Sequence, residues 1–225
     1  MSNQSYLYSI GFNPSERSKT EEDVVYGLSE YPSSVPMAYL VLASVDAQLC
    51  PSLIWEHEHP TAILANYEKG RHRLFAFLDA VAKVGAFDSN KLNLEIEKTK
   101  RFLNNPDNHS NYVLLELGEI FDFNDEPHEV QAQNFLKDLK NIDATMTAFL
   151  SSLAEWKKEI EENEMKLKVH NSVVFKLLFG FFSGKRKAEI EKEMKRAEDS
   201  KWFDLGIDEW GDILYFDLNE AEEEE

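Results

Sequence analysis

Cysteine is almost absent from this sequence, which has a single one, Cys50, among 225 residues. One cysteine excludes an intramolecular disulfide and a cysteine-rich zinc module, and it is typical of a protein from a reducing compartment. Glycine and proline are also scarce, at 9 and 7 residues. Because 43% of the residues are hydrophobic and 12% are aromatic, the chain can bury a core and is not expected to be disordered as a whole.

Basic residues are few as well. The chain has 24 Lys and Arg against 42 Asp and Glu, which gives a net charge of −18. Such a charge repels phosphate backbones, so we expect no direct binding to nucleic acid. The most apolar run, 173–182, is ten residues long, whereas a membrane-spanning helix needs about 20. The first residues lack the features of a signal peptide, so we predict a cytoplasmic protein without membrane contact.

Recognisable catalytic motifs are missing too. There is neither a Gly-x-Ser-x-Gly nor a Gly-x-Gly-x-x-Gly sequence, and 180–186 departs from a phosphate-binding loop in its spacing. The run Glu56-His57-Glu58-His59 is the one cluster with metal-binding character, but no second ligand pair accompanies it. We therefore predict no catalytic residue, no metal and no cofactor, and we expect that the protein is not an enzyme.

Secondary structure is expected along most of the chain. Alternation of apolar and polar residues predicts a strand at 5–10, and two short apolar runs predict strands at 112–117 and 212–218. Pro36 predicts the start of a helix at 37–43, because proline is tolerated in the first helical turn. Apolar residues at spacings of three and four predict helices at about 61–84 and 92–103.

The most regular pattern is a heptad seam in the second half. Apolar residues recur at alternating spacings of four and three: Phe135, Leu139, Ile142, Met146, Phe149, Leu153, Trp156 and Ile160. This pattern predicts one long helix from about Glu129 to Glu164. Because its seam needs a partner, we expect an antiparallel helical hairpin over about 129–201.

These elements together predict an α+β fold that is predominantly helical, with a small sheet that uses both chain termini. Residues 1–128 and 202–225 are expected to form the α+β body, and the hairpin packs on it or projects from it. The length suits one large domain or two closely packed ones, and we expect a single folding unit.

Charge is distributed unevenly. Residues 165–196 hold nine Lys and Arg against three Glu, whereas 198–225 hold one Lys and twelve acidic residues. Acidic residues alternate with aromatic ones at 119–126 and 204–212, a composition suited to binding a basic protein surface. The predicted partner-binding residues are Asp122, Phe123, Asp125, Glu126, Asp208, Glu209, Trp210 and Asp212. Two alternatives stay open: the charges pair internally, and the aromatic rings belong to the core.

Three segments resemble an uncharacterised family of bacterial cytoplasmic proteins: 2–9, 52–60 and 210–217. That family opens with an Asn-x-Ser-Tyr-Leu-Tyr box, which here is Asn3-Gln4-Ser5-Tyr6-Leu7-Tyr8. Its members are similar in setting to immunity proteins encoded beside secreted antibacterial toxins, including type VI secretion effectors. The resemblance implies a protein that binds a toxin and needs no active site.

Charge and resemblance together predict an immunity protein that neutralises a cognate toxin. The expected toxin is a secreted nuclease, whose basic cleft an acidic protein can occlude. One alternative is a helical adaptor or oligomerisation protein, in which the 129–201 hairpin docks a partner helix or a second copy. Another is a metal-dependent hydrolase centred on 56–59.

Overall fold

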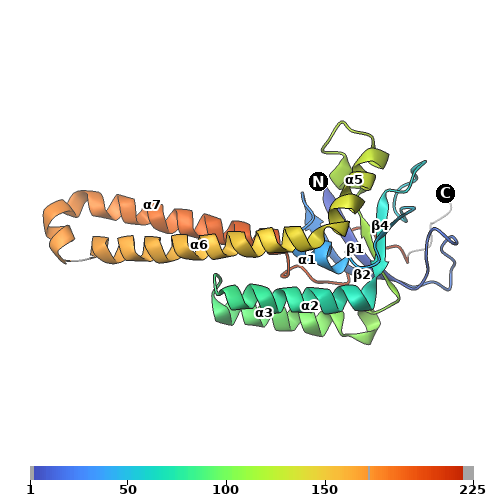
Figure 1. Cartoon of the computed structure of the whole chain (residues 1–225), viewed down its shortest axis with the longest axis horizontal. Helices are drawn as coiled ribbons and strands as arrows, with labels where there is room; N and C mark the ends of the chain where they lie inside the picture. Colours follow the sequence, from blue (N-terminus) through green and yellow to red (C-terminus); the bar gives the residue numbers. More distant parts are fainter. Residues whose placement is uncertain (1–2, 172, 220–225) are drawn as a thin grey trace.

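The fold is a sheet with a helical layer on one face and a long helical hairpin, as the computed structural model shows (Figure 1). It describes residues 3–171 and 173–219, with the side chains of 3–168 and 187–219. The sheet is antiparallel with the order β2-β1-β5-β4-β3, which confirms the predicted α+β class. Its strands are β1 (Gln4–Ile10), β2 (Val25–Pro32), β3 (Gln48–Cys50), β4 (Ala62–Asn66) and β5 (Tyr112–Glu116).

The two faces of the sheet have different cores. Side chains alternate along a strand, so Leu7 and Leu115 point to one face and Tyr8 and Leu114 to the other. The first face is covered by helices, among them α1 (Met37–Leu42), α2 (Tyr67–Val84) and α3 (Ser89–Leu103). The second face is covered by irregular chain, namely the loop after β3 and the segment that follows the hairpin.

The C-terminal segment does not form the strand expected at 212–218. It contributes one isolated bridge, between Trp210 and Ser29 of β2, and then crosses the second face of the sheet. The Tyr8 hydroxyl donates to the carbonyl of Phe216 at 2.9 Å. Further on, the Asn219 side chain accepts a hydrogen bond from the Val25 N–H at 2.9 Å and donates to the Val25 carbonyl at 2.7 Å. Side-chain packing and these bonds hold the segment in place of a strand ladder.

The predicted long helix at 129–164 is in fact two helices. Asn141 separates α5 (His128–Lys140) from α6 (Ile142–Asn171), and its backbone departs from helical values at φ −104° and ψ 22°. The break lets α5 approach the end of β3 while α6 packs on α2 and α1. The seam itself is a buried stripe, because Leu139, Ile142, Leu153 and Trp156 belong to the core.

The expected hairpin consists of α6 and α7 (Val173–Leu205), which lie side by side and extend well beyond the body (Figure 1). The apolar run 173–182 begins α7. None of the described helices combines the length and the apolar character that a bilayer span requires.

Helix α2 begins later than the periodicity suggests, because 62–66 pairs in the sheet as β4. Asn66 ends the strand and caps the helix, and its side-chain oxygen accepts a hydrogen bond from the Lys69 N–H at 2.9 Å. Within α2, Gly70 lies against the end of α1. A Cβ atom at this position would be 2.0 Å from the Leu42 carbonyl oxygen. Two short helices complete the fold: the 3₁₀ helix η1 (Pro106–Asn108) and α4 (Gly118–Phe121).

Candidate functional site

Two acidic segments that are far apart in the sequence meet beside one end of the sheet. Cys50 at the end of β3 pairs with Ala62 of β4, and Leu115, one residue before the end of β5, pairs with the adjacent Ile63, so the loops after these strands leave from the same end of the sheet. The first loop carries 56–59, and the second carries 122–129. We call their carboxylates the acidic patch: Glu56, Glu58, Asp122, Asp125, Glu126 and Glu129.

The first part of the loop after β3, residues 52–55, is held in place by hydrogen bonds and aromatic packing. Ser52 accepts hydrogen bonds from the backbone N–H groups of residues 54 and 55, at 3.0 and 2.9 Å. The Leu53 N–H donates to the Glu116 carboxylate at 2.7 Å. Trp55 packs between Tyr6 and Phe216, with ring centroids 6.1 and 5.6 Å away. The residues that follow, 56–59, are therefore held at the surface by an anchored stem.

The segment after β5 is organised by Gln131, a buried residue of α5. Its side-chain amide donates to the carbonyl of Phe121 at 2.9 Å and to that of Glu126 at 2.7 Å. These bonds fix both ends of the exposed stretch between α4 and α5. Glu119 ties the same segment to β1, because its carboxylate accepts from the Gln4 N–H at 2.7 Å. The acidic residues therefore project from a constrained loop.

Histidine side chains join the two segments. The rings of His57 and His128 lie edge to face, with centroids 5.1 Å apart. His128 Nε2 is 3.0 Å from the Asp122 carboxylate, and His59 Nε2 is 3.3 Å from that of Glu129. The contacts cross from one segment to the other, so the patch is one surface.

The patch is strongly negative near neutral pH. Neither 51–66 nor 102–136 contains a Lys or Arg, so no side chain of these segments offsets the six carboxylates with a permanent positive charge. Burial, followed by the proximity of His128, lowers the pKa of His57 against the opposing effect of Asp122. This shift favours the neutral imidazole. Phe123, which lies between Asp122 and Asp125 in the chain, is 55% exposed. The segment after β5 therefore offers an exposed aromatic ring together with negative charge.

The Glu56–His59 run was a metal candidate in the sequence. Within the described part of the chain, no three His, Cys, Asp or Glu side chains are placed to hold one ion. The two histidines of this run instead contact His128 and Glu129 on the neighbouring segment.

The second predicted partner-binding segment, 204–212, lies elsewhere, along the edge strand β2. The Gly211 N–H donates to the Leu28 carbonyl at 3.0 Å, and Trp210 packs between Tyr39 and Phe102. The indole of Trp210 is half-buried and also borders Lys98 and Arg101, so this acidic segment has cations beside it. Asp208, Glu209 and Asp212 are exposed. Among described residues, no hydrogen bond or ion pair joins this segment to the acidic patch.

Three of the eight predicted residues thus belong to the patch, Phe123 lies in the same segment, and four lie along β2. Sequence reasoning did not assign Glu56, Glu58 and Glu129 to this surface. The available signal was the lack of Lys and Arg in both segments, but their proximity follows from the strand order, which the sequence does not state.

Comparison with known proteins supplies a family. The model of a family described as a domain of unknown function (DUF7822) matches residues 12–157. The match includes the strands β2 to β5 and the whole acidic patch. Neither the curated proteins nor the solved structures give a match.

Proposed function

The chain belongs to the DUF7822 family, and we propose that it is an immunity protein that captures a basic antibacterial toxin through the acidic patch. The observation that carries this proposal is the contact between two segments that together carry six carboxylates and the exposed ring of Phe123. In such an interface, charge accelerates encounter and a buried aromatic side chain holds the complex.

A nuclease is the toxin class that best fits this surface. Nucleases bind phosphate backbones with basic clefts, and a negatively charged loop can occupy such a cleft in place of the substrate. The anchored stems at Ser52 and Gln131 support this role, because a constrained loop loses little conformational entropy when it binds. Blocking the cleft requires no chemistry from the inhibitor. We therefore also propose that the protein is not an enzyme and that it acts in the cytoplasm.

Charge reversal tests the patch. In the triple variant Asp122→Lys, Asp125→Lys and Glu126→Lys, three carboxylates of the patch become cations. We expect association with the toxin encoded beside this gene to slow by about 10–100-fold at low salt. Binding should also become less sensitive to ionic strength. Surface plasmon resonance at two salt concentrations measures both effects, and co-expression with the toxin measures loss of protection.

A matched variant separates the patch from the overall charge. Glu21→Lys, Glu22→Lys and Glu97→Lys change the net charge equally at exposed positions outside the patch. This control should retain most of the association rate. If both triple variants behave alike, the patch is not the contact surface, and if the wild type neither binds the toxin nor restores growth, the proposed function is wrong.

A further inference from the structure

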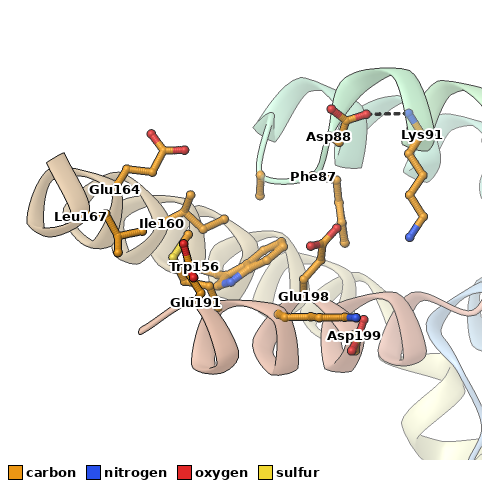
Figure 2. Close-up of a pocket in the computed structure, with 13 residues that line it drawn as sticks. Phe87, Asp88, Lys91, Trp156, Ile160, Glu164, Leu167, Glu191, Glu198 and Asp199 are labelled. Atoms are coloured by element: carbon orange, nitrogen blue, oxygen red, sulfur yellow. Dashed lines mark hydrogen bonds between the residues drawn. The ribbon is translucent and has the colours of Figure 1, made fainter. Parts of the chain in front are cut away.

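A hollow lies at each end of helix α3, and the two differ in charge. The hollow at the start of α3 faces the two arms of the hairpin, and carboxylates of both arms surround its apolar side chains (Figure 2). The hollow at the end of α3 has a volume of about 650 Å³, and we call it the Trp210 hollow. It is lined by Lys98, Arg101, Phe102, Asn104, Asn105 and Trp210. Its lining thus includes two cations and no carboxylate, in a chain whose net charge is −18.

Helical periodicity brings the two cations and one aromatic ring together. Arg101 and Phe102 follow Lys98 by three and four residues, so the three side chains lie on one face of α3. Lys98 and Arg101 are exposed, whereas Phe102 is partly buried against the core. The last turns of the helix therefore present a ring with two positive charges beside it.

Trp210 reaches this face from the edge of the sheet and is held there by its two neighbours. The Ser29 hydroxyl donates to the carbonyl of the residue before Trp210, and the Gly211 N–H donates to the Leu28 carbonyl at 3.0 Å. The Trp210 ring packs on that of Phe102, with centroids 6.0 Å apart and planes tilted by 32°. The aromatic wall of the hollow is therefore formed before anything binds.

The polar groups that remain free in the hollow are hydrogen-bond donors. Lys98 and Arg101 can only donate. The side-chain oxygen of Asn104 already accepts from Arg71 at 2.6 Å, and that of Asn105 accepts from a backbone N–H at 3.3 Å. Among the described residues, neither amide nitrogen has an acceptor. A ligand of this hollow therefore needs acceptor atoms, and the two cations favour a negative charge on them.

Neither cation is tied to a buried partner. Within the described residues Arg101 makes no ion pair, and Lys98 has one exposed contact, with Glu95 at 2.9 Å. An exposed ion pair of this kind contributes little free energy, so Lys98 can exchange it for a ligand.

The negative end of the helix dipole is also partly neutralised, which matters because free carbonyl groups would repel an anion. The Phe102 carbonyl accepts from the Asn105 N–H at 3.1 Å and from the Asn108 side chain at 3.2 Å. The Leu103 carbonyl accepts from the Tyr67 hydroxyl at 3.0 Å. These bonds occupy carbonyls of the last turn and leave the cations to set the charge of the hollow.

We propose that the Trp210 hollow binds a small organic anion that carries a planar ring, such as a nucleoside monophosphate or an aromatic carboxylate. The ring stacks on Trp210 and Phe102, and the anionic group accepts paired hydrogen bonds from the Arg101 guanidinium. The volume lies in the range of small-molecule sites. The hollow shares no residue with the acidic patch, so this proposal goes beyond toxin binding and is tested without a toxin.

Titration of the isotope-labelled full chain by nuclear magnetic resonance tests the proposal. The chain has four tryptophans, and the indole N–H signal that is lost in Trp210→Phe identifies Trp210. Two ring anions, adenosine monophosphate and naphthoate, should shift this signal with a Kd of about 0.1–1 mM. Adenosine lacks the anion and inorganic phosphate lacks the ring, so each should bind at least about 10-fold more weakly.

A pair of variants locates the anion. Arg101→Gln removes the guanidinium and should weaken binding of both ring anions by about 10–100-fold, because charge-assisted hydrogen bonds are lost. It should leave the weak binding of adenosine unchanged. Lys100→Gln is the matched control. It removes the same charge from the same helix, but Lys100 lies 3.1 Å from Asp79 of α2 and does not line the hollow.

Four results would overturn the proposal. In the first, neither ring anion moves the Trp210 signal at about 10 mM. In the second, phosphate binds as tightly as adenosine monophosphate, so that the ring contributes nothing. In the third, adenosine binds as tightly, so that the hollow does not recognise the anion. In the fourth, Arg101→Gln and Lys100→Gln weaken binding equally while circular dichroism shows both to be folded, so that only the overall charge matters.

Discussion

Replacing Glu116 by glutamine should stabilise the protein by about 3 kcal/mol at pH 8 and leave its stability almost unchanged at pH 4.5. Glu116 is fully buried at the end of β5, on the face that the C-terminal segment and the loop after β3 cover. One of its oxygens accepts from the Leu53 N–H, and the other is buried with no hydrogen-bond partner among the described residues.

The sign of the stability change follows from the proton that the Glu116 carboxyl group retains in the folded state. Burial raises the pKa of Glu116 from its ordinary value of 4.5 to about 7, although the hydrogen bond from the Leu53 N–H and the nearby Ser52 hydroxyl act in the opposite direction. Between these two values the folded protein binds more protons than the unfolded chain, so stability falls as the pH rises. Glutamine keeps the acceptor for Leu53 and carries no charge. The variant should therefore lack this pH dependence.

Urea unfolding at pH 4.5, 6 and 8 measures the prediction. Glu97→Gln, at an exposed position of α3, is the control for loss of one carboxylate and should keep the wild-type pH profile. A Glu116→Gln variant that is no more stable than the wild type at pH 8 would show that the carboxylate is ionised in the folded protein at little cost. Glu116 accepts a hydrogen bond from Leu53, at the start of the loop that carries 56–59. The same titration therefore also measures how this contact contributes to the stability of the patch.

Replacing Gly70 by alanine should destabilise the protein by about 3 kcal/mol and lower its Tm by about 10 °C. In an exposed helix this substitution stabilises by about 1 kcal/mol, because alanine is the better helix former. Here the added Cβ would be 2.0 Å from the Leu42 carbonyl oxygen and 3.0 Å from its carbon. Both are backbone atoms of α1, so the two helices must move apart, and the core between α1 and α2 must open.

Gly211→Ala is the matched substitution, because a Cβ at that position meets no atom within 4 Å. Differential scanning calorimetry of both variants should give a Tm near that of the wild type for Gly211→Ala alone. If Gly70→Ala raises the Tm, helix propensity outweighs the clash and α1 does not lie as close to α2 as described.

The parts of the fold that the sequence predicted are those with a local pattern. Strand β1 alternates, α1 follows Pro36, and the seam from Leu139 to Trp156 has helical spacing, so each element is visible without knowledge of its neighbours. The failures have non-local causes. The 62–66 run has an apolar pattern that fits a helix or a strand, and pairing with β3 and β5 selects the strand.

The break at Asn141 is a failure of the same kind. The heptad spacing continues through it from Leu139 to Ile142, so nothing in the pattern ends the helix. The cause is that α5 and α6 pack on different parts of the body. The strand expected at 212–218 also failed, because after the single bridge between Trp210 and Ser29 of β2 its apolar residues pack across the second face of the sheet.

For the candidate site, the sequence identified the acidic and aromatic residues at 119–126, but it did not show that 56–59 lies beside them. Composition identifies such a segment, whereas its contact with 56–59 depends on β3 and β5 ending at the same end of the sheet. Residues such as Gln131, which orders the loop with two hydrogen bonds, have no signature in a single sequence.

Residues 214–218, which cover part of the second face of the sheet, come late in the chain, and this position has a consequence for biosynthesis. All five strands have left the ribosome about 100 residues before 214–218 emerges, which at about 5–20 residues per second is a delay of roughly 5–20 s. During that interval Tyr6, Tyr8 and Leu114 lack the cover of 214–218, and only the loop after β3 shields part of this face on the nascent chain. This window is when a chaperone is most needed, and when arrest of translation would leave a product prone to aggregate.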